Sequence, residues 1–217
     1  AGEKITTGYG NVMMGREAGA GKVSTVGAIA IGYRAGLADA ASYDIFMGYE
    51  AGANTKGGGN LGIGRQAGRG SNGVSEYGGT SGSLNTSVGH YAGQFLLGSG
   101  NAMFGYQAGY YASGSSNTFV GKEAGKGGTT SAPYSSGQYN TAVGYRALEE
   151  FTTGGYNSIL GQEAGEKITT ADSNALLGYR AGRHLTTGGG NIVIGSEAQR
   201  DENVSSVVAI GTRAGLY

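Results

Sequence analysis

The stretch "GYRAG" occupies residues 32–36, and close variants of it return along the whole chain. Aligned on its first glycine, the phrase occurs in twelve copies. The aligned glycines are Gly15, Gly32, Gly48, Gly64, Gly89, Gly105, Gly121, Gly144, Gly161, Gly178, Gly195 and Gly211. Their spacing is 16 or 17 residues, apart from intervals of 25 residues after Gly64 and 23 residues after Gly121. So short a period predicts a solenoid that carries two insertions.

Four columns of the repeat indicate how each coil is built. The third residue after the aligned glycine is alanine in all twelve copies, and the fourth is glycine in ten, so these columns have no room for bulk. The residue just before the aligned glycine is always a sizeable apolar one, which predicts a core column. Asparagine stands four residues before the glycine in nine copies. We expect these amides to form a structural ladder between coils rather than a ligand site.

The three residues before each aligned glycine have the composition of a strand. Examples are "IVI" at 192–194 and "VAI" at 208–210, which are short and rich in β-branched residues. A helix is excluded because glycine interrupts every window that an amphipathic helix would need. The sequence therefore predicts an all-β protein, a parallel β-solenoid (β-roll) of about twelve coils of 16–17 residues, with residues 1–217 as a single unit.

The second residue after the aligned glycine tests whether one repeat equals one rung. In the last six coils its charge alternates in sign, in the order Glu123, Arg146, Glu163, Arg180, Glu197, Arg213. Stacked coils place equivalent side chains about 4.8 Å apart, where opposite charges attract and like charges repel. We therefore expect these six residues to form a structural charge ladder.

Composition excludes several classes of function. The 15 basic and 15 acidic residues balance without a basic stripe, so neither a nucleic acid nor an anionic membrane surface is expected as a partner. No apolar run approaches the roughly 18 residues of a membrane helix, so this segment is not expected to insert into a membrane. The chain has no cysteine, and its two histidines lack obvious partners, which argues against a catalytic, metal or cofactor site. Glycine supplies 47 residues, about three times the usual share of roughly 7%. So much glycine is costly to order, unless a repeated geometry requires it.

A single chain is expected to need partners. Each coil offers one short apolar strand, whereas the rest of the repeat is mostly Gly, Ser, Thr and Asn. Burial of three apolar side chains yields roughly 2 kcal/mol each, less than the cost of about 1.5 kcal/mol for ordering each of some sixteen residues. The strand therefore has little to pack against within its own chain, and we expect it to pack against other chains.

The phrase N-x-x-φ-G-x-x-A-G, with φ apolar, resembles the head repeats of trimeric autotransporter adhesins. It is also similar to repeats of phage tail fibres and tail-fibre-like bacterial adhesins, and "NTAVGYRAL" at 140–148 is the nearest copy. The resemblance implies a left-handed β-roll, a homotrimer, and an extracellular place on a cell surface or a virion fibre. It further implies adhesion to a surface glycan or a receptor protein. Because "AGEKITT" at 1–7 repeats at 164–170, we expect a segment of a longer fibre.

Recognition is expected at the insertions, near residues 69–82 and 126–139, which leave the coil at the same point of the repeat. Both carry tyrosine among small polar residues, and Tyr77, Tyr134 and Tyr139 are the candidate ligand-binding residues. Tyrosine suits stacking on sugar rings or protein surfaces. The alternative is that both insertions are tolerated surface loops without a ligand.

Two other functions remain open from the sequence. A tailspike-like glycan hydrolase would need carboxylates clustered in a groove. An ice-binding solenoid would need a flat rank of threonines, for which Thr152, Thr169 and Thr186 are candidates. We expect no enzyme: the predicted role is structural and adhesive.

Overall fold

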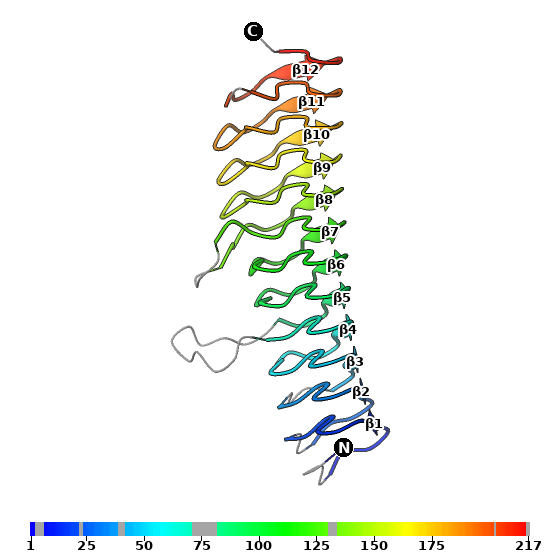
Figure 1. Cartoon of the computed structure of the whole chain (residues 1–217). Helices are drawn as coiled ribbons and strands as arrows, with labels where there is room; N and C mark the ends of the chain where they lie inside the picture. The colour runs from blue at the N-terminus through cyan, green and yellow to red at the C-terminus, as the bar shows by residue number, and fades with distance from the viewer. Residues whose placement is uncertain are drawn as a thin grey trace.

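The computed structural model describes residues 1–2, 7–21, 24–38, 42–70, 82–129, 134–201 and 203–215. Over these residues the chain is an all-β solenoid without a helix. Figure 1 shows the strands stacked above one another along one side of the molecule, with the rest of each coil looping away from them and the two termini at opposite ends. The predicted parallel β-solenoid is confirmed.

Each repeat contributes one strand to a single twelve-stranded parallel sheet, whose strands follow chain order. The strands are β1 (Val12–Met14), β2 (Ile29–Ile31), β3 (Ile45–Met47), β4 (Leu61–Ile63), β5 (Thr86–Val88), β6 (Ala102–Phe104), β7 (Thr118–Val120), β8 (Thr141–Val143), β9 (Ser158–Leu160), β10 (Ala175–Leu177), β11 (Ile192–Ile194) and β12 (Val208–Ile210). Equivalent residues of neighbouring repeats pair in register, for example Leu160 with Leu177. The prediction that one repeat equals one rung is confirmed.

The aligned glycine ends every strand for two physical reasons. Gly144 has a φ of 138°, a conformation that side chains rarely adopt. A Cβ placed on Gly144 would also lie 2.5 Å from the carbonyl oxygen of Gly161 in the next coil. Backbone thus stacks on backbone at this corner, which only glycine permits.

Three columns form the interior of the coil. The central residue of each strand points inward, and examples are Phe46, Met103 and Phe119. The alanines of the repeat are buried beside it. The third column holds the apolar residue that precedes the threonine pair in later coils, including Phe151 and Ile168. The prediction that the strand has little to pack against in its own chain is therefore wrong for its central residue.

In most coils the glycine that follows the alanine of the repeat lies against the central strand residue of the same coil. A Cβ on Gly125 would lie 2.5 Å from the Phe119 ring, so glycine is required where that residue is large. In the coil where the central residue is Ala142, the same position holds Leu148, which is fully buried with a φ of 56°. Leucine here occupies space that a small central residue leaves open.

The asparagine column forms a ladder through the coils. Asn140 Oδ1 accepts the backbone N–H of Asn157 at 3.1 Å, and Asn157 Oδ1 accepts that of Asn174 at 3.0 Å. The side-chain amides donate to carbonyl groups of the loop, as from Asn157 to Ala171 at 2.9 Å. These amides satisfy buried backbone groups, so the column has the structural role expected of it.

Candidate functional site

The first and third residues of each strand point away from the interior and form one continuous surface, which we call the apolar face. None of these positions holds a charged residue, and the third is apolar in every strand. Large side chains stand open on it, with Met14 58% exposed, Leu160 50% and Leu177 44%. A hollow of approximately 420 Å³ lies on this surface between β8 and β11. The apolar face is far larger than the single exposed apolar residues that are normal on a protein surface.

The prediction of a core column just before the aligned glycine is wrong for the single chain. Successive residues of a strand point to opposite sides of the sheet, so a three-residue strand can turn only its middle or its two ends inward. The burial pattern shows the middle inside, as in β9, where Ile159 is buried and Ser158 and Leu160 are exposed. The most uniformly apolar column of the sequence therefore lies on the outside.

The six residues of the charge ladder lie one above another, all in left-handed backbone conformations with φ between 54° and 60°. Arg146 Nε lies 3.0 Å from Glu123, Arg180 Nε 2.6 Å from Glu163, and Arg213 Nε 3.0 Å from Glu197. The hydrogen bond from Arg180 holds the pKa of Glu163 below its ordinary value. A neighbouring column adds ion pairs, such as Arg200 with Glu197 at 3.1 Å.

The column directly after the aligned glycine combines tyrosines with cations. The Lys122 Nζ lies 5.9 Å from the ring centre of Tyr106 and 5.5 Å from that of Tyr145. Arg65 lies in the same way between Tyr49 and Tyr91. Each cation is within the range of cation–π attraction, so these tyrosines bind side chains of neighbouring coils.

The threonine column uses its hydroxyl groups within the chain. Thr152 Oγ1 donates to the Thr169 carbonyl oxygen at 3.0 Å, and Thr169 Oγ1 donates to that of Thr186 at 3.0 Å. Hydroxyl protons held in this way are not available to order water molecules. The arrangement favours a structural ladder over an ice-binding surface.

The two candidate tyrosines that the structure describes, Tyr134 and Tyr139, do not lie in one site. Tyr77 lies outside the described residues. Tyr134 stacks on Phe95 and Tyr111, with ring centres 5.2 and 5.9 Å away, and belongs to an aromatic cluster. Tyr139 is 53% exposed and stacks on Tyr156 at 5.0 Å in a separate pair. The structure thus gives Tyr134 and Tyr139 different surroundings.

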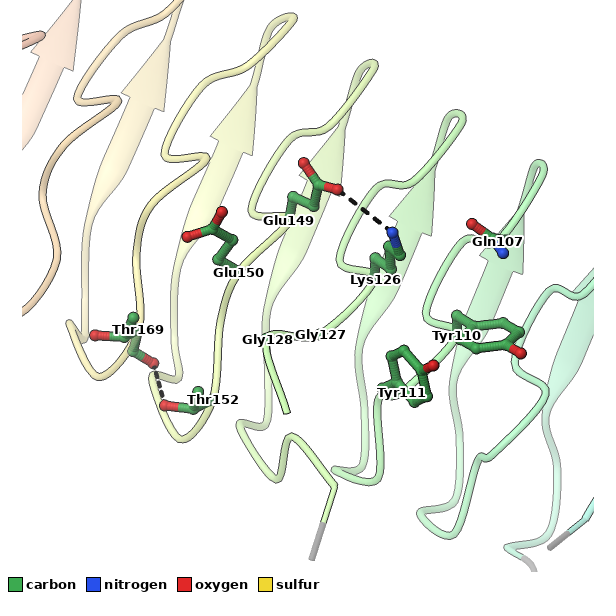
Figure 2. A pocket seen from close by; sticks show the side chains of 10 residues that line it. All are labelled: Gln107, Tyr110, Tyr111, Lys126, Gly127, Gly128, Glu149, Glu150, Thr152 and Thr169. Carbon is green, nitrogen blue, oxygen red and sulfur yellow. Dashed lines mark hydrogen bonds and ion pairs between the residues drawn. The ribbon is translucent and has the colours of Figure 1, made fainter. Parts of the chain in front are cut away.

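A polar cavity of approximately 510 Å³ opens beside the aromatic cluster. Figure 2 shows Tyr110 and Tyr111 on one wall, Glu149 and Glu150 on the other, and Lys126 on the coil between them. The remaining lining residues are Gln107, Gly127, Gly128, Thr152 and Thr169. Phe95, Tyr111, Gly127 and Glu150 occupy the same position in four successive repeats. The cavity lies at the coil of Gly127, where glycine leaves open the space that a large side chain fills in the neighbouring coils.

The charges in the cavity are already paired. Glu149 lies 3.7 Å from Lys126 and 3.4 Å from Arg146, and Glu150 pairs with Lys167. Burial raises the pKa of Glu149, while Arg146 and Lys126 oppose that shift. Burial also raises the pKa of Tyr110. The walls of this cavity come from four coils, so no single segment of the sequence indicates the site.

The described residues contain no group of three acidic or histidine side chains that could hold a metal ion. Within the same ranges no helix is long and apolar enough to cross a membrane. His90 stacks on Tyr91 at 4.1 Å, and His184 lies 3.6 Å from Asp201 on the surface.

Comparison with protein-family models, with curated proteins and with solved structures finds no match for this chain.

Proposed function

We propose that the chain is a structural and adhesive segment of a homotrimeric fibre outside the cell, on a cell surface or a virion. The apolar face carries the proposal. It runs along all twelve strands, has no charge and leaves large side chains half exposed. A fibre whose chains pack through this face would present their loops outward, where a surface glycan or a receptor protein can bind.

The partner that fits the apolar face best is a second copy of the same chain. The face repeats once per strand, at a spacing of about 4.8 Å, over the length of the sheet. A partner must match that period to bury every rung, and an identical chain in parallel register does so. Burial of a half-exposed Leu, Ile or Met side chain such as Leu160 contributes about 1 kcal/mol, and the gain accumulates along the stack.

Three copies suit the width of the face. Each strand is only three residues long, so the apolar face is a narrow stripe. Three such stripes set around a common axis each contact two neighbours, which forms a closed assembly without a free apolar edge. This agrees with the trimer that the resemblance to adhesin repeats implies. The left-handed β-roll that the same resemblance implies is also part of the proposal.

We propose no enzymatic role. A glycan hydrolase needs one carboxyl group as acid and a second as base or nucleophile. Glu149 and Glu150 line one cavity, yet each is engaged by a cationic side chain. An ice-binding role is not proposed either, because the threonine hydroxyl groups already donate hydrogen bonds to carbonyl oxygens of the next coil.

Disulfide cross-linking tests the assembly, because the chain contains no cysteine. We expect Leu160→Cys, on the apolar face, to form covalent dimers on mild oxidation. Around a threefold axis only two of three equivalent thiols can join, so one third of the chains should stay uncross-linked. Thr170→Cys, an exposed position that follows Thr169 on the loop side of the coil, is the control and should stay monomeric on the gel.

Complete conversion of Leu160→Cys to covalent dimers would indicate a twofold assembly and contradict the trimer. No cross-linking above the level of the control would show that the apolar face is not a contact between copies. Both outcomes can be read from one non-reducing gel with a reduced sample beside it.

A further inference from the structure

The cavity of Figure 2 is separate from the apolar face and has no part in the proposed assembly. We propose that it binds a single neutral sugar residue of a surface glycan. This inference rests on the adhesive part of the proposed function and names the ligand class and the side chains that recognise it. At approximately 510 Å³ the cavity lies in the range of small-molecule sites, which is about 300 to 1,000 Å³.

The aromatic wall supplies the apolar contact that a sugar ring needs. Tyr110 and Tyr111 line the cavity and are partly exposed. Their rings meet almost at right angles, at 85° with ring centres 4.4 Å apart. Tyr111 also stacks against Phe95 at 5.5 Å, which fixes its orientation. A rigid tyrosine corner can pack against the C–H face of a pyranose while its hydroxyl groups hydrogen-bond to the sugar.

The rest of the lining supplies acceptors and donors for sugar hydroxyl groups. Glu149 and Glu150 offer carboxylate oxygens, Lys126 an ammonium group and Gln107 an amide. Within the part of the chain that the structure describes, no hydrogen bond involves the Gln107 side chain, so its donor and acceptor are both open to a ligand. Groups held in fixed positions around a cavity recognise a polyol by several hydrogen bonds at once.

The paired charges select a neutral ligand. A cationic sugar would compete with Lys126 and Arg146 for Glu149, and with Lys167 for Glu150. An anionic sugar would bring a further negative charge beside Glu149 and Glu150, and the cations that could neutralise it are already engaged by these two carboxylates. A neutral hydroxyl group can donate a hydrogen bond to a free lone pair of an ion-paired carboxylate, and the ion pair stays intact.

A glycan is favoured over a soluble single sugar by the proposed trimer. One small polar cavity gives weak binding, because little apolar area is buried. Three cavities on one fibre would engage a dense glycan surface together, and their effective concentration would raise the affinity of the whole.

The test is saturation-transfer NMR on the full chain, with free sugars at concentrations up to about 50 mM, because a site this small is expected to bind in the millimolar range. The probes are glucose, galactose, mannose and N-acetylglucosamine, with glucuronic acid, N-acetylneuraminic acid and glucosamine as charged counterparts. We expect transfer to at least one neutral sugar and weaker transfer to its charged counterpart.

Two variants locate the binding. Gln107→Ala and Tyr110→Ala should each weaken binding about tenfold, which corresponds to one lost hydrogen bond or ring contact. Gln162→Ala and Tyr43→Ala remove exposed side chains of the same types away from the cavity and should leave binding unchanged. Gln107→Ala removes no internal hydrogen bond, so it keeps the test valid if Tyr110→Ala fails to fold.

Absence of transfer to every neutral sugar would overturn the inference, as would binding of the charged sugars alone. Binding that persists unchanged in both cavity variants would also overturn it. Light scattering on the same samples separates the two proposals. A trimer that binds no sugar refutes the cavity and leaves the assembly, whereas a monomer that binds refutes the assembly and leaves the cavity.

Discussion

Replacement of Asn157 by alanine tests the asparagine ladder, which joins one coil to the next. The Asn157 side chain is fully buried. Its Oδ1 accepts hydrogen bonds from the backbone N–H and from the side-chain Nδ2 of Asn174, each at 3.0 Å. Its Nδ2 donates to the carbonyl oxygen of Ala171 at 2.9 Å and to Asn140 Oδ1 at 3.0 Å. Alanine removes all four hydrogen bonds at once.

The expected loss follows from which partners are left unsatisfied. Asn140 Oδ1 keeps the backbone N–H of residue 157, and Asn174 Nδ2 keeps the Gly188 carbonyl oxygen. The backbone N–H of Asn174 and the carbonyl oxygen of Ala171 are buried and lose their hydrogen bonds to the Asn157 side chain. An unsatisfied buried group costs about 1–3 kcal/mol, so the free energy of unfolding should fall by about 4 kcal/mol.

Urea unfolding measures that free energy, and amide hydrogen exchange of Asn174 reports the local effect. Asn203→Ala is the matched control. Asn203 Oδ1 also accepts two backbone N–H groups, from Thr187 at 3.0 Å and Gly188 at 2.8 Å, but Asn203 is exposed and water can replace it. The control should lose less than about 1 kcal/mol. Equal losses in the two variants, or unchanged exchange at Asn174, would refute the reasoning.

Three further outcomes are expected. Arg180→Glu should lower the melting temperature at low salt, and lower it less at about 1 M salt, because the variant puts a like charge beside Glu163. An equal effect at both salt concentrations would contradict the ion pair. The pKa of Glu163 is lowered in the folded state, so the ionised carboxylate stabilises the fold above its ordinary pKa near 4.5, and this stabilisation is lost as the pH falls through the folded pKa. The melting temperature of the parent protein should therefore drop on acidification more than that of a Glu163→Gln variant. Gly144→Ala should prevent folding, since its Cβ meets the Gly161 carbonyl oxygen, whereas Gly211→Ala shares the positive φ without that clash and should fold with a lower melting temperature, as circular dichroism would show.

The period of the aligned glycines was enough to predict the rungs and their register. The reason is physical: a residue such as Gly144 is required by both its φ and the carbonyl group stacked on it, so the sequence cannot vary there. The asparagine column was equally readable, because each amide serves the backbone of the next coil.

The direction of the strand residues was not readable in the same way. A three-residue strand can turn either its centre or its two ends inward, and the uniformly apolar column at its third residue predicts an interior that the fold places at the centre instead. The true interior column varies from Ala142 to Phe119, because Leu148 and Gly125 compensate for its size from elsewhere in the coil. Such compensation between separated positions leaves no regular signal in the sequence.

The cavity was hidden for a related reason. It depends on Gly127, which stands at a position where neighbouring repeats have larger side chains. Because glycine is so frequent in this chain, one further glycine does not indicate a cavity. Tyr110 and Glu149 are thirty-nine positions apart and meet only because the coils stack.

The mass of the folded protein in solution tests the central claim most directly. The apolar face predicts a particle of three chains, with a mass near three times 21.7 kDa by multi-angle light scattering and no dissociation on dilution to about 1 μM. A folded, stable particle of 21.7 kDa at every concentration would contradict the claim that the apolar face is buried between copies of this chain.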